Sequence, residues 1–139
     1  MEGTRNRQRD VPRATALGMV SVLFDTNILI DYLKGVRQAR TELERYSDRA
    51  ISLITWMEVM VGASPETEES TRHFLNSFTN LPIDDQVSSV AVILRKNNKI
   101  KLPDAIVWAT AQVNKRIFVT RNTRDFLPNE PGIHIPYQL

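Results

Sequence analysis

The sequence predicts an α/β fold with a mostly parallel central sheet. Short runs of β-branched and aromatic residues, which are typical of buried strands, alternate along the chain with stretches of helical periodicity. No internal repeat, low-complexity tract or interdomain linker interrupts this alternation. Strands that are separated by helices pair in parallel and are covered by helices on both faces, so a single layered α/β domain accounts for the whole pattern.

The predicted strands are short apolar segments. The first is an uninterrupted run of β-branched and aromatic residues, and the later ones follow helical stretches. The expected strands are 20–24, 50–53, 81–83 and 117–120, with a last short strand at 132–135.

The predicted helices lie between these strands. The first ends at Gly35, the second carries charges of alternating sign that are typical of an exposed helix, and Ser64-Pro65 separates two further helices. The expected helices are 28–33, 36–46, 55–63, 66–78, 86–97 and 104–114, with one helical turn at 122–126.

The composition is that of one soluble domain. The chain has 139 residues, of which 42% are hydrophobic and 24% charged, enough for a core without covalent cross-links. There is no cysteine, which excludes disulfides, thiolate metal sites and cysteine nucleophiles. We therefore expect a reducing compartment and a cytoplasmic location. The apolar runs are far shorter than a membrane span, so no membrane association is expected.

The first 18 residues differ from the rest. Four arginines against two acidic residues there account for the whole net charge of +2, which leaves 19–139 neutral. We expect 1–18 to be a disordered extension, or the product of an upstream start codon, because Met19 directly precedes the first strand. Weak nucleic-acid binding and an organelle presequence are the alternatives. The folded domain is expected to span 19–139.

Acidic residues recur where strands meet helices. Asp25 follows the first strand, and Glu58 falls in the first turn of the helix after the second strand. Asp104 begins a helix, and Asp125 comes just after the fourth strand. Strand-to-helix junctions of a parallel sheet gather along its carboxyl edge, where ligands bind. We expect the four carboxylates to converge at this edge. For Asp104 this requires that the N-terminus of its helix points to the same edge.

Each of these acids also has a purely structural explanation. Thr55-x-x-Glu58 matches a capping box, and Asn122-x-x-Asp125 and Asp25 can likewise cap helices. Asp104 follows Pro103 in the first turn of a helix, where the helix dipole favours a negative charge. For each acid considered alone, helix capping is at least as good an explanation as a role in a functional site. Together, four carboxylates at one edge repel one another unless a cation lies among them, which favours a metal site.

The nature of the ion follows from the available side chains. The only histidines, His73 and His134, are remote from the junctions, so a histidine-based zinc site is not expected. An all-oxygen site suits Mg²⁺ or Mn²⁺, ions that bind phosphates and activate water for phosphodiester cleavage. Glycine-rich nucleotide loops and a GxSxG nucleophile motif are absent.

Four segments carry these acids and occur in order from about Val20 to Phe126. They are FDTNILIDYLKG (24–35), LITWMEVMVGA (53–63), LPDAIVWATA (102–111) and FVTRNTRDF (118–126). Together they resemble the signature blocks of PIN-domain ribonucleases, most closely the VapC toxins of type II toxin–antitoxin pairs. The resemblance implies a three-layer α/β/α fold and a metal-dependent endoribonuclease that cleaves RNA. It also implies a homodimer that is inhibited by a small VapB-type antitoxin protein.

The resemblance also assigns residues by motif position. It implies that the catalytic acids and ligands of Mg²⁺ or Mn²⁺ are Asp25, Glu58, Asp104 and Asp125. The residues that match the polar positions beside the site are Asn27, Thr120 and Asn122.

Basic residues near the predicted site have two explanations. They can grip RNA phosphates, or they can be a solvated helix end and counter-charges for the carboxylates in the absence of metal. The candidate RNA-binding residues are Arg95, Lys96, Lys99, Lys101, Arg121 and Arg124.

Two other functions remain compatible with the pattern. One is a catalytically silent PIN-like module that binds RNA or a protein partner, against which the retention of all four acids argues. The other is a phosphatase or phospho-acceptor domain. Such a domain uses an acceptor Asp with a supporting Lys or second Asp, whereas Asp25 is followed by Thr-Asn.

Overall fold

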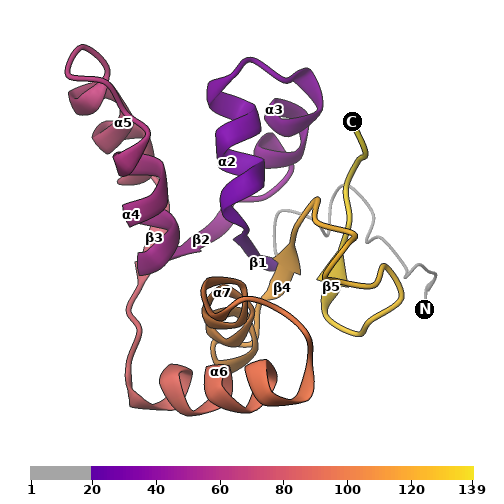
Figure 1. Ribbon diagram of the computed structural model, residues 1–139. Coiled ribbons are helices and arrows are strands. Elements are labelled where there is room, and N and C mark those ends of the chain that lie inside the picture. Colours follow the sequence, from indigo (N-terminus) through magenta and orange to yellow (C-terminus); the bar gives the residue numbers. More distant parts are fainter. Residues whose placement is uncertain (1–19) are drawn as a thin grey trace.

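The computed structural model describes residues 20–139, so the extension predicted at 1–18 lies outside the described residues. The chain forms a five-stranded sheet in the order β3-β2-β1-β4-β5, and every neighbouring pair is parallel (Figure 1). The strands are β1 Ser21–Phe24, β2 Asp48–Ser52, β3 Thr79–Leu81, β4 Ile117–Val119 and β5 Ile133–His134. The predicted parallel sheet is thus confirmed.

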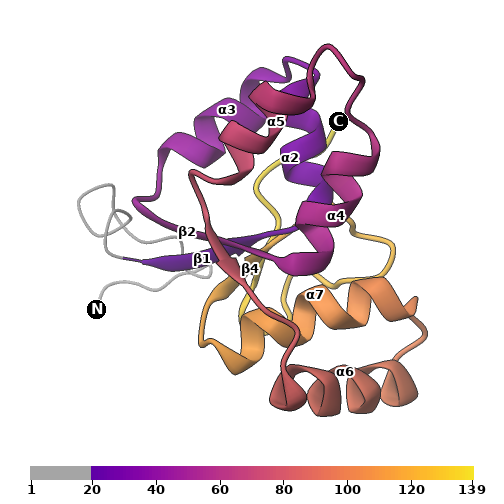
Figure 2. The same cartoon turned by 90° about the vertical axis from the view of Figure 1, so that its left-hand side faces the viewer.

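Helices cover both faces of this sheet. The helices of residues 20–139 are α2 Thr26–Leu33, α3 Arg37–Glu44, α4 Leu53–Val61, α5 Glu68–Leu75, α6 Asp85–Asn97 and α7 Leu102–Val113. In Figure 2, α2 to α5 lie above the sheet, α7 lies below it, and α6 packs on the outer side of α7. The three-layer α/β/α arrangement is therefore confirmed. Within residues 20–139, no helix has both the length and the hydropathy that a bilayer crossing requires.

Strand β1 lies in the centre of the sheet and is buried on both faces. Val22 and Phe24 belong to the core beneath α2 to α5, whereas Leu23 belongs to the core beneath α6 and α7. All three side chains are 0% exposed. Successive strand residues point to opposite faces, so a central strand with two covered faces needs the uninterrupted apolar run seen in the sequence.

The start of α4 differs from the prediction, and the difference changes the role of Glu58. The Ser52 hydroxyl accepts a hydrogen bond from the Ile54 N–H at 3.3 Å and caps the helix, so α4 begins at Leu53. Thr55 is buried inside the helix rather than capping it. The predicted Thr55–Glu58 capping box is therefore wrong, and Glu58 lies in the second helical turn, free of any capping role.

Other boundaries shift by a few residues. Strand β3 begins two residues earlier than predicted, because Thr79 pairs with Ala50 at the sheet edge, where an apolar pattern is not required. Helix α5 is shorter than 66–78, and Phe78 enters the core from the segment that follows it. The predicted helical turn at 122–126 is present as a single turn, closed by the Phe126 N–H donating to the Asn122 carbonyl at 3.2 Å, and it does not continue into a helix.

The order of the strands determines where a site can form. The chain runs from β1 to β2 and β3 on one side of β1, and returns to place β4 on the other side. Beyond the ends of these strands, the Asp25 N–H donates to the Val119 carbonyl at 2.8 Å and so extends the β1–β4 ladder. The carboxyl edge between β1 and β4 is thus a topological switch point, the usual location of a ligand site in such sheets.

Candidate metal centre

Asp25 occupies the switch point and is held by three donors. Its Oδ1 accepts the Thr26 N–H at 2.8 Å and so caps α2. Its Oδ2 accepts the Thr120 hydroxyl at 2.7 Å and the Asn27 Nδ2 at 3.2 Å. Two of the polar neighbours predicted from the sequence, Asn27 and Thr120, therefore contact this carboxylate directly.

Burial governs the electrostatics of Asp25. The residue is 5% exposed, and this desolvation is the main cause that raises its pKa to about 6. The hydrogen bonds from Thr120 and Thr26 lower the pKa, while the negative charges of Asp104 and Glu58 raise it further. Ionisation of Asp25 therefore destabilises the folded protein, and a cation bound beside the carboxylate would offset this destabilisation.

Thr26 connects Asp25 to the second acid. Its hydroxyl donates to Glu58 Oε1 at 2.7 Å and lies 3.0 Å from the Thr55 hydroxyl, which ties α2 to α4. Glu58 is otherwise exposed. Sequence reasoning assigned Thr26 no role in the site, although its position between Asp25 and Asn27 was the available signal.

The other two acids come from α7 and from the turn after β4. Asp104 is half-buried, and its pKa is raised by this burial and then by the charges of Asp125 and Glu58, with Lys101 acting in the opposite direction. The α7 N-terminus therefore points to the same edge, as the prediction required. Asn122 and Asp125 bond reciprocally, with Nδ2 to Oδ2 at 3.0 Å and the Asp125 N–H to Oδ1 at 3.2 Å, so the predicted Asn–Asp cap pattern is present in a turn.

The four carboxylates have no cationic partner among residues 20–139. None of the ion pairs there involves Asp25, Glu58, Asp104 or Asp125. No three acidic or histidine side chains of this part of the chain lie close enough together to ligate one ion directly. The donors are all oxygens, and none forms an ion pair within residues 20–139. Such a set fits Mg²⁺ or Mn²⁺, because Mg²⁺ commonly keeps several waters and binds through only one or two carboxylates.

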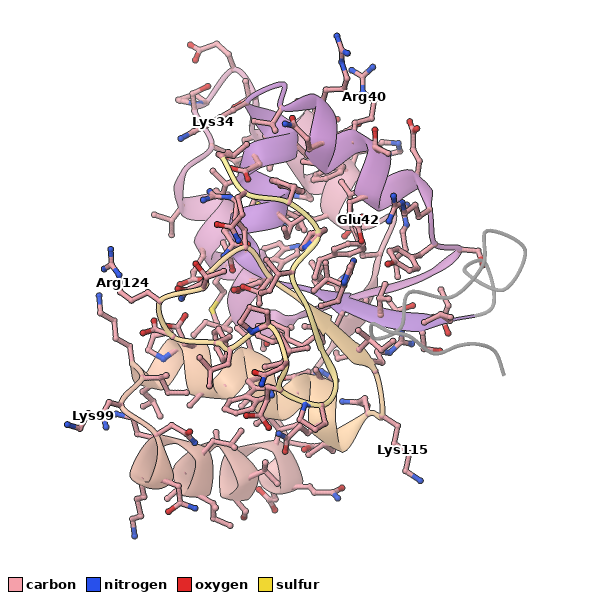
Figure 3. The ribbon with its side chains drawn as sticks, turned by 90° about the vertical axis from the view of Figure 1, so that its right-hand side faces the viewer. Lys34, Arg40, Glu42, Lys99, Lys115 and Arg124 are labelled. Carbon is pink, nitrogen blue, oxygen red and sulfur yellow. The ribbon has the colours of Figure 1, made fainter. Side chains whose placement is uncertain are left out.

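A cavity opens beside this centre and has charges of both signs. Its volume is about 600 Å³, and two of the acids, Asp104 and Asp125, line it together with Asn122. The basic residues that line it are Arg95, Lys99, Lys101 and Arg124. Figure 3 shows Lys99 and Arg124 projecting from the same side of the molecule. Of the six candidate RNA-binding residues, four thus surround the acids, while Lys96 is exposed outside the cavity.

Arg121, the remaining candidate, has a different environment. Its Nε and Nη2 donate to Asp31 Oδ2 at 2.6 Å and Oδ1 at 3.0 Å. Sequence reasoning missed Asp31, although a signal existed. Asp31 lies three residues after Ile28 on the apolar face of a short helix, and a carboxylate on such a face requires a partner.

Comparison with known proteins matches residues 22–127 to the family described as PIN domain. Among solved structures, the chain is similar to a toxin–antitoxin complex from Klebsiella pneumoniae, with 49% identity over 86% of this chain and 100% of that one and a TM-score of 0.82. A comparison with curated proteins found no match.

Two more distant structures share the fold. The DNA-bound VapBC from Salmonella typhimurium is 27% identical over 84% of this chain and 97% of that chain, with a TM-score of 0.67. FitAcB from Neisseria gonorrhoeae is 22% identical over 85% of this chain and 99% of that chain, with a TM-score of 0.71. At that identity, the FitAcB match concerns the fold alone.

Proposed function

Because the chain belongs to the PIN domain family, we propose that it is a metal-dependent endoribonuclease that hydrolyses RNA phosphodiester bonds, and the toxin of a type II toxin–antitoxin pair. One observation carries the enzymatic part. Four carboxylates around the carboxyl edge of the sheet lack a cationic partner within residues 20–139, and the most buried one, Asp25, has a pKa raised to about 6. A silent binding module would gain nothing from retaining this unfavourable charge.

The proposed metal-binding residues are the four acids named from the sequence, Asp25, Glu58, Asp104 and Asp125, one or two of them in direct contact with an ion and the others through waters that the ion keeps. When bound there, Mg²⁺ or Mn²⁺ would supply the positive charge that lowers the pKa of an attacking water and neutralises the scissile phosphate. The cavity beside Asp104 and Asp125 would give the scissile RNA phosphate access to the proposed metal site.

The residues around the acids orient them. Thr120 and Asn27 fix Asp25, Thr26 fixes Glu58, and Asn122 fixes Asp125. These contacts set the direction of each carboxylate before an ion arrives, which is the usual role of residues behind a metal ligand. Since water is the proposed nucleophile, the products should carry 5′-phosphate and 3′-hydroxyl ends.

The basic side of the cavity is the proposed path of the RNA backbone. Arg95, Lys99, Lys101 and Arg124 line the same cavity as two of the acids, so they can neutralise phosphates that flank the scissile one. Lys96 does not line the cavity and is the weakest candidate for RNA binding.

Partner binding is supported by relatives and by one apolar surface. A similar structure from Klebsiella pneumoniae is a toxin–antitoxin complex. On α4, Leu53, Met57 and Val61 recur every four residues and stay 41%, 43% and 86% exposed, an apolar stripe beside Glu58 that a protein partner would cover. We propose a small VapB-type antitoxin as this partner, a homodimeric toxin and a cytoplasmic location.

A cleavage assay tests the enzymatic proposal. The protein is purified free of antitoxin and incubated with structured RNA in Mg²⁺, in Mn²⁺ and in EDTA. We expect cleavage only with metal, and its loss in Asp25→Asn. The matched control is Asp85→Asn, an exposed acid at the start of α6, which should cleave like the wild type. Cleavage that persists in EDTA or in Asp25→Asn would refute the proposal.

Expression in a bacterial host tests the toxin assignment separately. We expect growth arrest that is relieved by co-expression of the small open reading frame adjacent to the gene. A protein that cleaves RNA without arresting growth would be a housekeeping nuclease. A silent module would neither cleave RNA nor bind Mn²⁺, and replacement of its acids would leave RNA binding intact.

A further inference from the structure

A further carboxylate of α2 is buried behind the candidate metal centre. Asp31 lies six residues after Asp25, which corresponds to roughly 9 Å along a helix axis. Its side chain is only 5% exposed. It accepts two hydrogen bonds from Arg121, at 2.6 Å and 3.0 Å, and a third from the Tyr137 hydroxyl at 2.8 Å. Three donors from two distant segments thus satisfy a charge that would otherwise be strongly unfavourable inside the protein.

Arg121 is also linked to the metal centre through its backbone. Its N–H donates to Asn27 Oδ1 at 3.2 Å, and Asn27 Nδ2 donates to Asp25 Oδ2 at 3.2 Å. The segment after β4 is therefore fastened to α2 at two places, near Asp25 by the backbone and at Asp31 by the side chain. In the sequence, Arg121 lies between the two residues that bond to the predicted ligands, Thr120 to Asp25 and Asn122 to Asp125.

We propose that Arg121 and Asp31 are positioning residues of the metal centre. Their pair fixes the segment after β4 against α2, so that Thr120 and Asn122 hold two carboxylates in a ligating orientation; this inference rests on the proposed metal-dependent function. A planar guanidinium meets both oxygens of a carboxylate in one orientation, which an ammonium cannot reproduce. The pair therefore determines the position of the segment and not merely its charge.

The surroundings of Arg121 distinguish this role from phosphate binding. Two of its donors are directed at Asp31, and the same carboxylate raises the pKa of the guanidinium. The cavity beside the acids is lined by Arg124 and not by Arg121. Arg121 thus acts through Thr120 and Asn122, without contact to RNA.

The other end of β4 provides a matched control. Arg116 directly precedes the strand, and its Nη1 donates to Asp48 Oδ1 at 2.9 Å. This second arginine–carboxylate pair also joins two segments of the chain, but it lies at the amino edge of the sheet, opposite the candidate metal centre. Replacement of this guanidinium, whose Nη1 also donates to the Val22 and Asp48 carbonyls, changes contacts at the amino edge without touching the four acids.

The experiment compares Arg121→Lys with Arg116→Lys. Mn²⁺ affinity is measured by titration calorimetry without RNA, and kcat and KM are measured at two salt concentrations. In Arg121→Lys we expect Mn²⁺ affinity and kcat to fall about 10- to 100-fold, as is typical when a residue behind a metal ligand is lost. KM should change by less than about twofold, because no phosphate contact is lost. Arg116→Lys should match the wild type in all three quantities.

Tyr137→Phe keeps the test decisive if Arg121→Lys does not fold. It removes one neutral donor to Asp31, and we expect Mn²⁺ affinity to fall about 2- to 10-fold. The control is Tyr32→Phe, which removes a hydroxyl from the residue next to Asp31 on α2. The Tyr32 ring stacks on Phe74 with ring centroids 4.8 Å apart, and its hydroxyl makes no hydrogen bond within residues 20–139.

Two results would overturn the proposal in different ways. Unchanged Mn²⁺ affinity in the Arg121 or Tyr137 variant would refute the positioning role, and a raised KM with weaker salt dependence in Arg121→Lys would assign that residue to RNA phosphates. A wild type that neither binds Mn²⁺ nor cleaves RNA would refute the proposed function itself, and this inference with it.

Discussion

Replacement of Asp25 by Asn should make the metal-free protein more stable while it abolishes cleavage. The pKa of Asp25 is raised from 3.8 to about 6, mainly by burial. At about 1.36 kcal/mol for each pH unit, the ionised carboxylate destabilises the native state by roughly 3 kcal/mol above pH 6. Asn removes this charge, yet its single oxygen cannot serve both Thr26 and Thr120, and the lost hydrogen bond costs about 1–2 kcal/mol.

The expected net gain for Asp25→Asn is therefore about 1–2 kcal/mol at pH 7.5 in EDTA, or roughly 3–8 °C in Tm for a domain of this size. The gain should depend on pH with a definite sign. As pH falls through 6 toward 4, native Asp25 takes up a proton that the unfolded chain does not yet bind, so the wild type becomes more stable relative to the variant. The advantage of Asp25→Asn should thus disappear between about pH 5.3 and 4.5 and be reversed below that range.

Thermal unfolding between pH 7.5 and 4.5 in EDTA provides the assay, and the same scans with Mg²⁺ complete it. A bound ion stabilises the wild type by mass action, about 2.7 kcal/mol at a concentration 100 times the Kd, whereas the variant should not respond. Asp85→Asn is the control, with a small loss of stability and no pH-dependent crossover. An Asp25→Asn variant that is less stable than wild type at pH 7.5, or a difference that is constant with pH, would refute the assignment of a buried, uncompensated charge.

Four further substitutions test other parts of the structure. Lys99→Ala and Arg124→Ala should each raise KM several-fold and reduce the salt slope of RNA binding by about 0.7, with kcat unchanged. The control Lys115→Ala, on the far side of the molecule, should change neither KM nor the salt slope. Equal effects of all three substitutions would mean that the basic residues attract RNA nonspecifically. Thr26→Val should lower kcat and Mn²⁺ affinity about 10-fold or more, because it removes the hydroxyl that orients the Glu58 carboxylate. Wild-type values in this variant would show that the Thr26–Glu58 hydrogen bond does not matter for the site. Phe126→Ala should cost about 3–5 kcal/mol in urea unfolding, because the ring is 1% exposed; a loss below about 1 kcal/mol would contradict its place in the core.

The order of the elements and the convergence of the acids followed from short-range signals. The apolar run of β1 and the polar residues directly after it specify a buried strand that ends at the carboxyl edge, so Asp25 was placed by its neighbours alone. The N-terminus of α7 reaches the same edge because helices between parallel strands run antiparallel to them. Such features depend on the local sequence and on general rules for parallel sheets.

The contacts that orient the acids were not predictable in the same way. Ser52 and Thr55 are both plausible caps, and the burial of Thr55 beneath α2 decided between them. The Asp31–Arg121 pair joins residues 90 positions apart. Such pairings depend on how helices are placed on the sheet, and no local propensity encodes them.

Capping and metal binding are not competing roles for Asp25. Oδ1 accepts the Thr26 N–H and so aligns the carboxylate with the axis of α2, while Oδ2 accepts Thr120 and Asn27 from the side of β4. Each carboxylate oxygen offers two acceptor lone pairs, so Oδ1, with a single donor, retains one for a cation. The cap thus orients the ligand, and the ion would relieve the charge that burial makes unfavourable. A residue that only capped the helix would not need to be buried beside two other carboxylates, whose charges raise its pKa further.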